Sequence, residues 1–369
     1  MALVTLHSTQ NDPGKAMQEL RDGLRGLSPR FLLFFASSAF APDALGAALR
    51  ATFGAVPSIG CTTAGELVSG RMLKGAIVML AMDEAELHSV AIATIDDMHD
   101  RERAIAAVDR LASAVGIPAG DLDPGSYLGL VLQDGLSVAE EAVMEALGTA
   151  TNVPFIGGSA GDDVKFRATH VFVNSEPRTG AAVLALLKPK RPFHLLKTQS
   201  FDVLPETLVV TDVDEATRTV KAFNGKPATQ EYARVIGVPV EKLESRFQSN
   251  PVGLVLANGE PFVRSPQQIK GTDVVFYCQV KQGMSLQLLQ ARNIVEDTRR
   301  DFAAKVREIG GCRAAINFHC ILRTLELEQK NQCDAYAKIF AEVPTVGFST
   351  YGESYIGHIN QTSTMVLFE

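Results

Sequence analysis

The sequence lacks tryptophan, and it also lacks a long apolar run and a surplus of basic residues. No apolar run approaches the roughly 20 residues that a membrane span needs. The amino-terminal segment has neither a basic region nor a long apolar core, so we expect no signal peptide. A net charge of −7 argues against nucleic acid as the main partner. We therefore expect a cytoplasmic protein that engages neither membrane nor nucleic acid.

Cysteine is scarce as well, and its spacing fits no disulfide framework. The chain has five: Cys61, Cys278, Cys312, Cys320 and Cys333. An odd number without a regular spacing is typical of reduced cytosolic thiols. Three of them lie close to His319 in the sequence, but no C-x-x-C pair occurs, and neighbouring residues of a strand point to opposite faces. We therefore expect no structural zinc site.

What the sequence does contain is the composition of a folded globular protein. It has 369 residues, of which 46% are hydrophobic and 21% charged, which is enough for two domains with ample cores. Short apolar runs alternate with helical patterns along the chain. We predict an α/β protein of two packed α/β domains with mixed sheets and no low-complexity linker between them.

One motif occurs three times, at Val56–Glu66, Val153–Asp162 and Val343–Glu353. Each copy begins with Val-Pro, reaches an aliphatic residue and a glycine, and ends in small residues, glycine and a carboxylate. Proline suits the first residue of a strand, and glycine permits a bend or a close approach of the backbone. The hydroxyl groups can bind a ligand or tie down the loop. The repetition indicates an internal repeat, with two readings: three structural turns, or loops that line a pocket.

The elements before each motif repeat in the same order. We expect strands at 30–37, 127–132 and 314–322, and helices at 42–53, 137–147 and 325–340. The repeating unit is therefore strand, helix, strand and Gly-rich loop. The pattern becomes β-rich from 193 to 222, and Asn224-Gly225 signals a tight turn. We place the domain boundary there, which gives domains at 1–222 and 223–369.

Several local patterns make sharper predictions. Asn11 or Asp12 as the cap, with Pro13 in the first turn, predicts the start of a helix, and Ser137 with Glu140 forms a capping-box pattern. In the second domain we expect a helix at 228–236, strands at 252–257 and 273–279, a long helix from about 285 to 309, and a last strand over 358–368.

Gly157–Gly161 matches the G-x-S-x-G elbow of hydrolases. That elbow needs a helix directly after Ser159, and residues 162–173 alternate like a strand instead. No copy of the repeated motif has the Lys-Ser/Thr of a P-loop or a full dinucleotide fingerprint. We therefore expect a protein without enzyme activity.

His319 is the most distinctive candidate for a binding role. In an extended strand its side chain would share a face with Asn317 and Arg323. An imidazole in an apolar strand is costly unless it is hydrogen-bonded or ligated. It is either a core histidine bonded to a neighbour, or a metal or haem ligand with Arg323 beside it for a carboxylate or propionate. His358, near Asn360 in the last strand, is the second candidate.

Four stretches together resemble one protein family: Val56–Glu66, Asn224–Ala228, Phe318–Arg323 and Gly347–Glu353. They are similar to those of a FIST protein, in which a FIST N-terminal domain precedes a FIST C-terminal domain. The resemblance covers nearly the whole chain. The segment Gly352–Thr362 is similar to the nitric-oxide-sensing NosP branch of the family.

The resemblance implies a bacterial intracellular signal-transduction sensor that binds small ligands such as amino acids. The nitric-oxide-sensing branch binds haem and regulates a partner histidine kinase or a cyclic-di-GMP enzyme. The chain carries no kinase, cyclase or phosphodiesterase motif, so its output would pass through a partner. The first hypothesis is therefore a haem-binding sensor of nitric oxide, and the second is a haem-free sensor of an amino-acid-like ligand. A homo-oligomer is compatible with both.

The binding residues follow from strand chemistry and from the resemblance. We expect the site to contain His319, Arg323, Phe348, Ser349, Thr350, Tyr351, Glu353, His358 and Asn360, with His319 as the ligand of the haem iron. Without tryptophan, the apolar walls of a haem pocket would come from the 19 phenylalanines. In the haem-free hypothesis, the loop Ser349–Glu353 forms the pocket and Arg323 holds a carboxylate.

Overall fold

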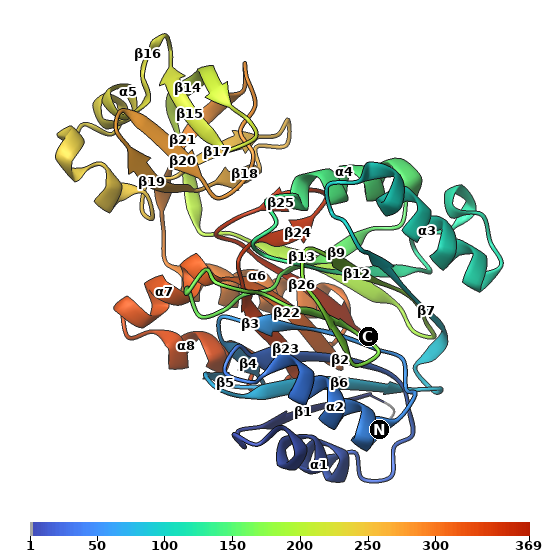
Figure 1. Cartoon of the computed structure of the whole chain (residues 1–369). Helices are drawn as coiled ribbons and strands as arrows, with labels where there is room; N and C mark the ends of the chain where they lie inside the picture. Colours follow the sequence, from blue (N-terminus) through green and yellow to red (C-terminus); the bar gives the residue numbers. More distant parts are fainter. Residues whose placement is uncertain (1–2) are drawn as a thin grey trace. The chain divides into compact units, whose positions relative to one another are not determined.

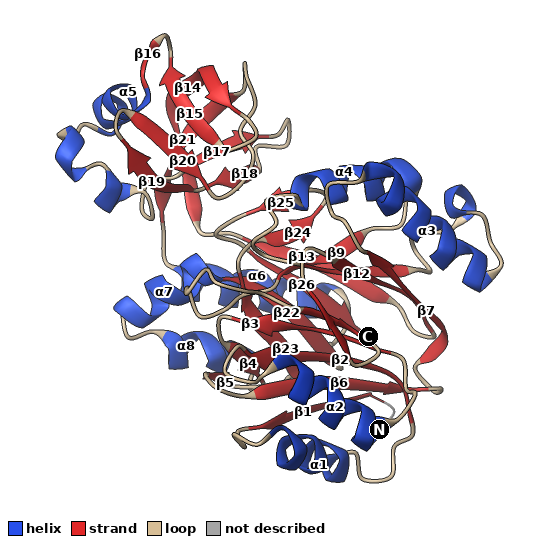
Figure 2. Ribbon diagram, in the orientation of Figure 1, coloured by secondary structure: helices blue, strands red, loops and turns tan. Residues whose placement is uncertain are grey.

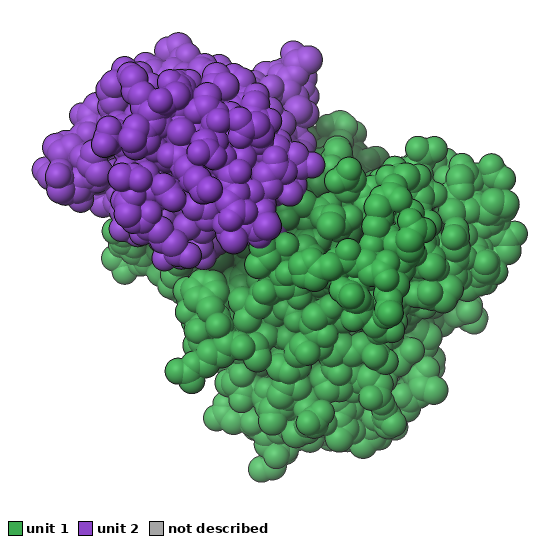
Figure 3. All heavy atoms as spheres, turned by 45° about the horizontal axis from the view of Figure 1, so that its top comes forward, with its two compact units in different colours: residues 1–198, 298–358, 363–369 green, residues 199–297, 359–362 purple. Residues whose placement is uncertain are grey.

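The computed structural model describes residues 3–369, which form two compact units (Figures 1 and 3). Unit 1 comprises the residues up to Thr198 together with Thr298–His358 and Ser363–Glu369. Unit 2 comprises Gln199–Asp297 and Ile359–Thr362. The predicted boundary near residue 222 falls inside unit 2. The compact units therefore divide the chain at other residues than the predicted domains do.

Unit 1 contains three six-stranded mixed sheets (Figure 2). Sheet 1 has the order β1 (Leu3–Ser8), β6 (Ile77–Asp83), β2 (Pro29–Ser37), β3 (Ser58–Thr63), β10 (Val171–Val173) and β11 (Glu176–Arg178). Sheet 2 has the order β7 (Leu87–Ile95), β12 (Ala182–Pro189), β8 (Leu128–Gln133), β9 (Phe155–Ser159), β24 (Glu353–Tyr355) and β25 (His358–Ile359). Sheet 3 has the order β13 (Phe193–Thr198), β26 (Ser363–Phe368), β22 (Ala314–Cys320), β23 (Thr345–Thr350), β4 (Glu66–Val68) and β5 (Arg71–Leu73).

The first four strands of every sheet follow one plan. The first three strands run antiparallel to their neighbours, and the fourth runs parallel to the third. Helices join the parallel strands: α2 (Pro42–Phe53) in the first repeat, α4 (Glu140–Ala150) in the second, and α7 (Ile321–Gln329) with α8 (Cys333–Ala337) in the third. Each fourth strand lies within one copy of the Val-Pro motif. The predicted strand-helix-strand repeat and the α/β class with mixed sheets are confirmed.

The last two strands of each sheet come from a different repeat. Hairpin β4–β5 of the first repeat pairs with β23 in sheet 3, hairpin β10–β11 of the second pairs with β3 in sheet 1, and β24 of the third pairs with β9 in sheet 2. The exchange is cyclic, because each repeat gives a hairpin to one neighbour and receives one from the other. No sheet of unit 1 is therefore complete within a single repeat.

One apolar core lies between the three sheets. It includes Phe35 of sheet 1, Leu130 of sheet 2 and Phe318 of sheet 3, all wholly buried. The outer face of sheet 1 packs on α2 and on α1 (Pro13–Gly23), which Asp12 caps as predicted. The outer face of sheet 2 packs on α4 and on α3 (Arg101–Val115). Sheet 3 is covered by α7, α8 and α6 (Ile294–Glu308). Here the contacts include hydrogen bonds between buried polar side chains, such as Asn317 with Tyr336 and Arg323 with Thr298.

The geometry that the three copies of the motif share explains its first glycine. Each of these glycines lies in register with a residue of the parallel neighbour: Gly60 with Phe34, Gly157 with Val131 and Gly347 with Asn317. A β-carbon at Gly157 would lie 1.7 Å from the Val131 carbonyl oxygen, and one at Gly347 would lie 2.1 Å from that of Asn317. Such contacts are far shorter than van der Waals separation. The glycines therefore permit a close approach of the backbone, which was one of the two predicted reasons for them.

Unit 2 is mainly β-structure. Its strands are β14 (Phe201–Asp214), β15 (Thr219–Phe223), β16 (Lys226–Pro227), β17 (Val252–Val255), β18 (Pro261–Arg264), β19 (Pro266–Lys270), β20 (Asp273–Phe276) and β21 (Ser285–Ala291). The predicted helix is present as α5 (Ala228–Ile236), whose Tyr232 packs on Phe223 at 6.0 Å between ring centroids. Asn224 and Gly225 have φ of 51° and 74°, so the predicted tight turn is confirmed.

Two predicted elements are wrong in their extent. The long helix from about 285 begins only at Ile294, because residues 285–291 form β21, where Leu286 and Leu288 alternate into the core of unit 2. The last strand is interrupted, since residues 360–362 separate β25 from β26 and belong to unit 2. At 285–291 the leucines fit both a helical and an alternating pattern, and pairing with β14 and β17 makes the segment a strand. At 360–362 the chain leaves the extended conformation, since Gln361 has φ of 50°.

Three further corrections concern helix ends. The strand predicted over 314–322 stops at Cys320, so Arg323 lies on α7 and not on the strand. The capping box at Ser137 does not form: α4 starts at Glu140, and Val138 has φ of 55°, which turns the chain before the helix. The helix predicted over 325–340 divides at Asn331, which has φ of 55°.

No helix within residues 3–369 has both the length and the apolar character needed to cross a bilayer. Cys61, Cys278, Cys312, Cys320 and Cys333 are free thiols.

Candidate functional site

The three motif loops meet inside unit 1, joined by backbone hydrogen bonds. Ala64 N donates to Ser349 O at 3.1 Å, and Gly161 N donates to Thr62 O at 2.9 Å. Ser159 N donates to Gly352 O at 2.9 Å, which closes the cycle from the third copy back to the second. Most hydroxyl groups of the motifs serve these loops. The first reading, three structural turns, therefore accounts for much of the motif, and a site must be sought where the repeats differ.

The repeats differ on the outer face of the third strand of each sheet. Counted from the motif glycines, the equivalent outward residues are Phe34, Val131 and Asn317 and, two positions further on, Ala36, Gln133 and His319. At these two positions sheet 1 has only apolar residues, and sheet 2 has one apolar residue, Val131, and one polar residue, Gln133. Sheet 3 has an amide and an imidazole, both with no exposed surface. Shared ancestry of the scaffold does not explain a buried polar pair that appears at this place in the third repeat.

Polar side chains from sheet 3 and its three helices form a buried set, called here the polar layer. Its members are Thr298, Asn317, His319, Arg323, Thr324, Tyr336, Ser349 and Ser363. The Asn317 amide donates to the Tyr336 hydroxyl at 3.3 Å and accepts from Ser363 at 2.7 Å. The hydroxyls of Thr324 and Ser349 are 2.7 Å apart. These bonds fix the layer to β22, β23, β26 and the helices above them.

His319 is the penultimate residue of β22 and is enclosed by the polar layer. Its ring lies 4.5 Å from that of Tyr336, measured between centroids. Neither ring nitrogen has a hydrogen-bond partner among the described residues. Burial lowers the pKa of His319 well below its usual range, and the charge of Arg323 lowers it further. The imidazole is therefore neutral, with one donor and one acceptor unused.

Arg323 occupies the first turn of α7 and is 1% exposed. Its Nη2 donates to Thr298 at 2.7 Å, and its guanidinium carbon lies 5.9 Å from the centre of the Tyr336 ring. Nε and Nη1 have no partner, and no carboxylate pairs with this guanidinium among residues 3–369. A buried charge is normally paired, because burying it alone costs several kcal/mol. Arg323 therefore leaves two unused donors and a positive charge for a group that the described residues do not supply.

A small cavity borders the polar layer. It measures about 90 Å³, and its wall includes Thr324, Ser349, Glu66 and Cys333. Lys74 and Glu328 also line it and form an ion pair at 3.4 Å, with roughly half of each side chain exposed. The cavity holds about three water molecules by volume. It is an approach from solvent toward Thr324, the residue next to Arg323.

Three residues of the predicted site point away from this layer. Phe348 faces the central core and packs on Phe35 at 4.5 Å between ring centroids. Thr350 donates to the carbonyl oxygens of Gly352 and Ser159, so it stabilises the motif loop. The Tyr351 hydroxyl bonds to Asp162 and accepts from Val164 N at 2.8 Å, so it holds the loop after β9.

The other predicted residues are distributed between both units. Glu353 opens β24 and is wholly buried in sheet 2, where it lies opposite Gly158. The His358 ring packs directly against Gly352, where a β-carbon would lie 2.0 Å from Cε1. Asn360 is wholly buried and belongs to unit 2, and neither atom of its amide has a partner among the described residues. The structure therefore brings His319, Arg323 and Ser349 together in the polar layer.

Two alternative chemistries find no support in the geometry. Ser159 is the last residue of β9 and is followed by an irregular loop, so the helix that a nucleophile elbow requires is missing. Within residues 3–369, no three His, Cys, Asp or Glu side chains come together in a way that could hold a metal ion.

Sequence reasoning missed five members of the layer: Thr298, Asn317 as a site residue, Thr324, Tyr336 and Ser363. Comparison of the repeats contained a usable signal, because Asn317 and His319 replace apolar residues of the first repeat. Thr298 and Tyr336 gave no signal of this kind, since they come from helices whose packing on sheet 3 the sequence did not reveal.

Glu66 provides a pH-dependent test of the motif core. Burial raises its pKa to about 7, although Thr63 and Ala76 N hydrogen-bond the carboxylate. Between the ordinary value of 4.5 and about 7 the folded protein keeps a proton that the unfolded chain has lost. Stability must therefore fall as pH rises through this window, by up to roughly 3 kcal/mol. Urea unfolding at pH 5 and pH 8 should show this loss in the wild type and not in Glu66→Gln. An equal change of the unfolding free energy between the two pH values in both proteins would contradict the prediction.

Comparison with known proteins agrees with the two-part organisation. The model of the FIST N domain matches residues 30–226, and the model of the FIST C domain matches residues 228–355. An uncharacterized protein of Methanocaldococcus jannaschii is 22% identical over 282 residues, which cover 69% of this chain and 54% of that protein. The chain thus spans about half the length of the curated relative it matches.

Proposed function

Because this chain belongs to the FIST family, whose domains are signal-transduction sensors of small molecules, we propose that it detects a small anionic ligand in the polar layer. The ligand class is a carboxylate, such as an amino acid or a related metabolite. Arg323 binds the carboxylate and His319 contacts a second polar group of the same molecule. The protein itself carries out no turnover.

The observation that supports this proposal is the unpaired charge of Arg323. Its Nε and Nη1 lie on different edges of the guanidinium, and either one can hold a carboxylate side by side together with the second N–H of Nη2. The neighbouring neutral His319 offers a donor and an acceptor. An α-amino acid presents a carboxylate next to a polar nitrogen, so it matches both groups. Thr298, on α6, holds the guanidinium in place.

Binding would change the conformation of unit 1, because the polar layer is closed. Arg323 and Thr324 are 1% exposed, so a ligand can reach them only if α7 moves relative to sheet 3. The cavity beside Thr324 and the exposed Lys74–Glu328 pair mark the route of entry. A partner that binds the ligand-bound position of α7 with a different affinity from the ligand-free position would respond to the ligand. We propose a histidine kinase or another two-component output protein as that partner, in the cytoplasm of a bacterium.

Haem with nitric oxide as the signal is the second candidate, and one observation favours it. The unpartnered imidazole of His319 could ligate iron. The surroundings fit the group poorly: Tyr336 lies 4.5 Å from the imidazole, and the side chains beside it are Asn317, Ser349 and Ser363, which are polar. Metal-bound histidines also usually donate their second nitrogen to a fixed acceptor, and His319 has none among the described residues. We derive no step through haem.

A ligand screen separates the two candidates. Thermal unfolding of the wild type should be measured with a panel of amino acids and small carboxylates, each beside its carboxamide. A binder raises the melting temperature because it binds only the folded state. We expect a carboxylate to do so, and its neutral amide to bind about a hundred-fold more weakly, since it loses a charge-assisted pair.

A variant of His319 makes the screen decisive. His319→Phe keeps a ring against Tyr336 and should fold. It should lower the affinity for the carboxylate that binds best in the screen by at least about ten-fold. A Soret band that forms with the wild type and is changed in this variant would favour haem instead. Equal melting shifts from carboxylates and amides would contradict the anion-sensing proposal.

A further inference from the structure

The free edge of sheet 1 differs from the equivalent edges of the other two sheets. The first strands of the three sheets are β1, β7 and β13, and each has one side that pairs with no strand among residues 3–369. On β7, Arg110 of α3 donates to the carbonyl of Thr94 at 2.6 Å, and β13 carries Lys197. These are known protections of an exposed edge. β1, with the sequence Leu-Val-Thr-Leu-His-Ser, has no charged residue, no proline and no bulge along its pairing with β6.

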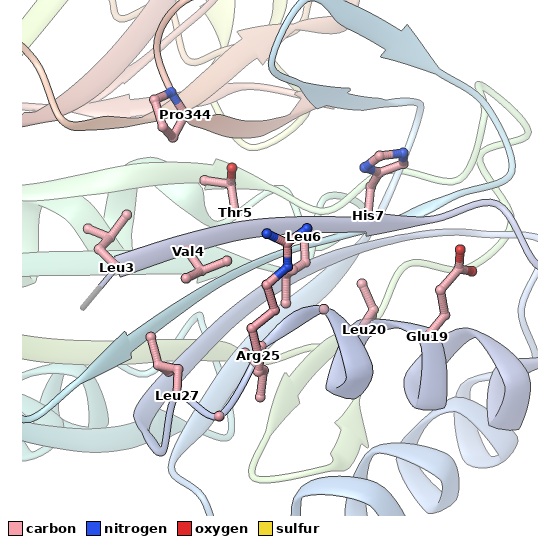
Figure 4. A pocket seen from close by; sticks show the side chains of 13 residues that line it. Leu3, Val4, Thr5, Leu6, His7, Glu19, Leu20, Arg25, Leu27 and Pro344 are labelled. Atoms are coloured by element: carbon pink, nitrogen blue, oxygen red, sulfur yellow. The ribbon is translucent and has the colours of Figure 1, made fainter. Parts of the chain in front are cut away.

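A groove of about 800 Å³ runs along this unprotected edge. Residues from both faces of β1 line it (Figure 4). Leu3 and Thr5 point toward the side of Pro344, whereas Val4 and Leu6 point toward the turn after α1. Leu20, Leu24 and Leu27 complete the apolar wall on that second side. The edge of β1 is thus the floor of this groove, called here the trough. The apolar residues on the Pro344 side and on the side of the turn after α1 form its two lips.

We propose that an extended segment of a partner protein binds here by adding a strand to β1. The outward backbone groups of an edge strand supply main-chain hydrogen bonds, and alternate side chains of the added segment fill the two lips. This inference is independent of the ligand site in the polar layer. It gives the sensor a surface through which a partner can be held.

The position of β1 between Pro344 and the turn after α1 favours an extended peptide over a second copy of the chain as the occupant. A strand that adds to β1 must protrude far enough to pass between Pro344 and the Arg25–Leu27 turn. The β1 of a second copy is itself recessed between the same lips, so the two sets of lips would collide first. An extended peptide has no such obstruction.

Charges define the chemistry of the segment. Arg25 points its guanidinium toward the strand (Figure 4), and no hydrogen bond joins it to another described residue. At the other end, His7 bonds to the guanidinium of Arg71, and the carboxylate of Glu19 also acts on His7, so the opposite charges of Arg71 and Glu19 offset each other there. Glu19 accepts from Ser8 at 2.6 Å. The segment should therefore be uncharged and β-branched in its centre, with a carboxylate at the end that lies beside Arg25.

The test uses the full-length protein and a fluorescein-labelled octapeptide of alternating valine and threonine with aspartate at both ends. We expect fluorescence anisotropy to report saturable binding, and amide hydrogen exchange to slow over residues 3–8. The same peptide with N-methyl groups on alternate residues should bind at least about ten-fold more weakly, because it cannot form the main-chain bonds.

Three variants locate the site. Thr5→Lys places a charge in the trough and should abolish binding, while Arg25→Glu should weaken it about ten-fold or more. Arg191→Glu, an equal charge change at an exposed position elsewhere, should leave it unchanged. Arg25 lies in an exposed turn, so its variant decides the matter even if Thr5→Lys fails to fold.

Three results would overturn the proposal. The first is equal binding of the N-methylated peptide. The second is displacement of the peptide by a long-chain fatty acid together with unchanged binding to Arg25→Glu, which would identify a lipid pocket. The third is a dimer in sedimentation with residues 3–8 already protected in the absence of peptide.

Discussion

Replacing Arg323 with methionine should make the ligand-free protein more stable and deprive it of its ligand response. The guanidinium is buried with a single hydrogen bond, to Thr298, and without a carboxylate. Exchange of a buried charge for an apolar side chain of similar length often stabilises by about 1–4 kcal/mol. The same change removes the group that would bind the anion. Urea unfolding, after refolding to strip bound molecules, and thermal shift with the best carboxylate measure the two effects.

The matched control is Arg313→Met. Arg313 donates to both oxygens of the buried Glu86, at 2.7 and 3.0 Å, so its charge is fully used. Its loss leaves the buried Glu86 carboxylate without its partner and should lower the free energy of unfolding by about 1–3 kcal/mol. Opposite signs for the two arginines would identify Arg323 as a group kept for binding. If Arg323→Met destabilises as much as Arg313→Met, the side chain has a structural role and the sensing proposal loses its main support.

Gly157→Ala should be the most damaging single methyl group in unit 1. The new β-carbon would lie 1.7 Å from the Val131 carbonyl oxygen, and both atoms belong to paired strands inside sheet 2. Neither backbone can move without breaking its own hydrogen bonds. We expect a loss of more than about 3 kcal/mol of stability, or failure to fold, which exceeds the usual cost of overpacking.

The other motif glycines turn this prediction into a series. At Gly347 the β-carbon would lie 2.1 Å from a carbonyl oxygen and at Gly60 it would lie 2.6 Å from one, so the damage should decrease in that order. Gly148, inside α4, has nothing within 4 Å of the new atom, so Gly148→Ala should stabilise by about 0.5–1 kcal/mol. Chemical unfolding of the four variants measures the series. Equal effects at all four positions would show that the close approach is not what matters.

Local pattern predicted the repeated unit well, because it rests on local physics. A short apolar run, a helix and a Val-Pro strand recur in order, and each step has its own signature in propensity or backbone geometry. The parallel pairing follows, since a helix is the usual connection between adjacent parallel strands. The same reasoning could not detect the exchange of hairpins. Which strand β4 pairs with depends on residues hundreds of positions away.

Apolar runs without clear periodicity produced the errors. Residues 285–291 contain leucines that satisfy both a helical and an alternating pattern, and only the pairing of β21 with β14 and β17 decides between them. At Cys320–Ile321 the chain passes from strand to helix without glycine or proline to mark the change. Arg323 was expected beside His319 on a strand, and it lies near the same Tyr336 ring from a helix.

The cyclic exchange of hairpins has a consequence for synthesis in the cell. Ser69 and Thr345, which hydrogen-bond where the first hairpin joins sheet 3, are 276 residues apart. At a ribosomal rate of 5–20 residues per second, the nascent hairpin waits on the order of 15–60 s for its partner. During that time its strand edges are open to other chains. Chaperones that shield emerging polypeptides should therefore raise the yield of this protein.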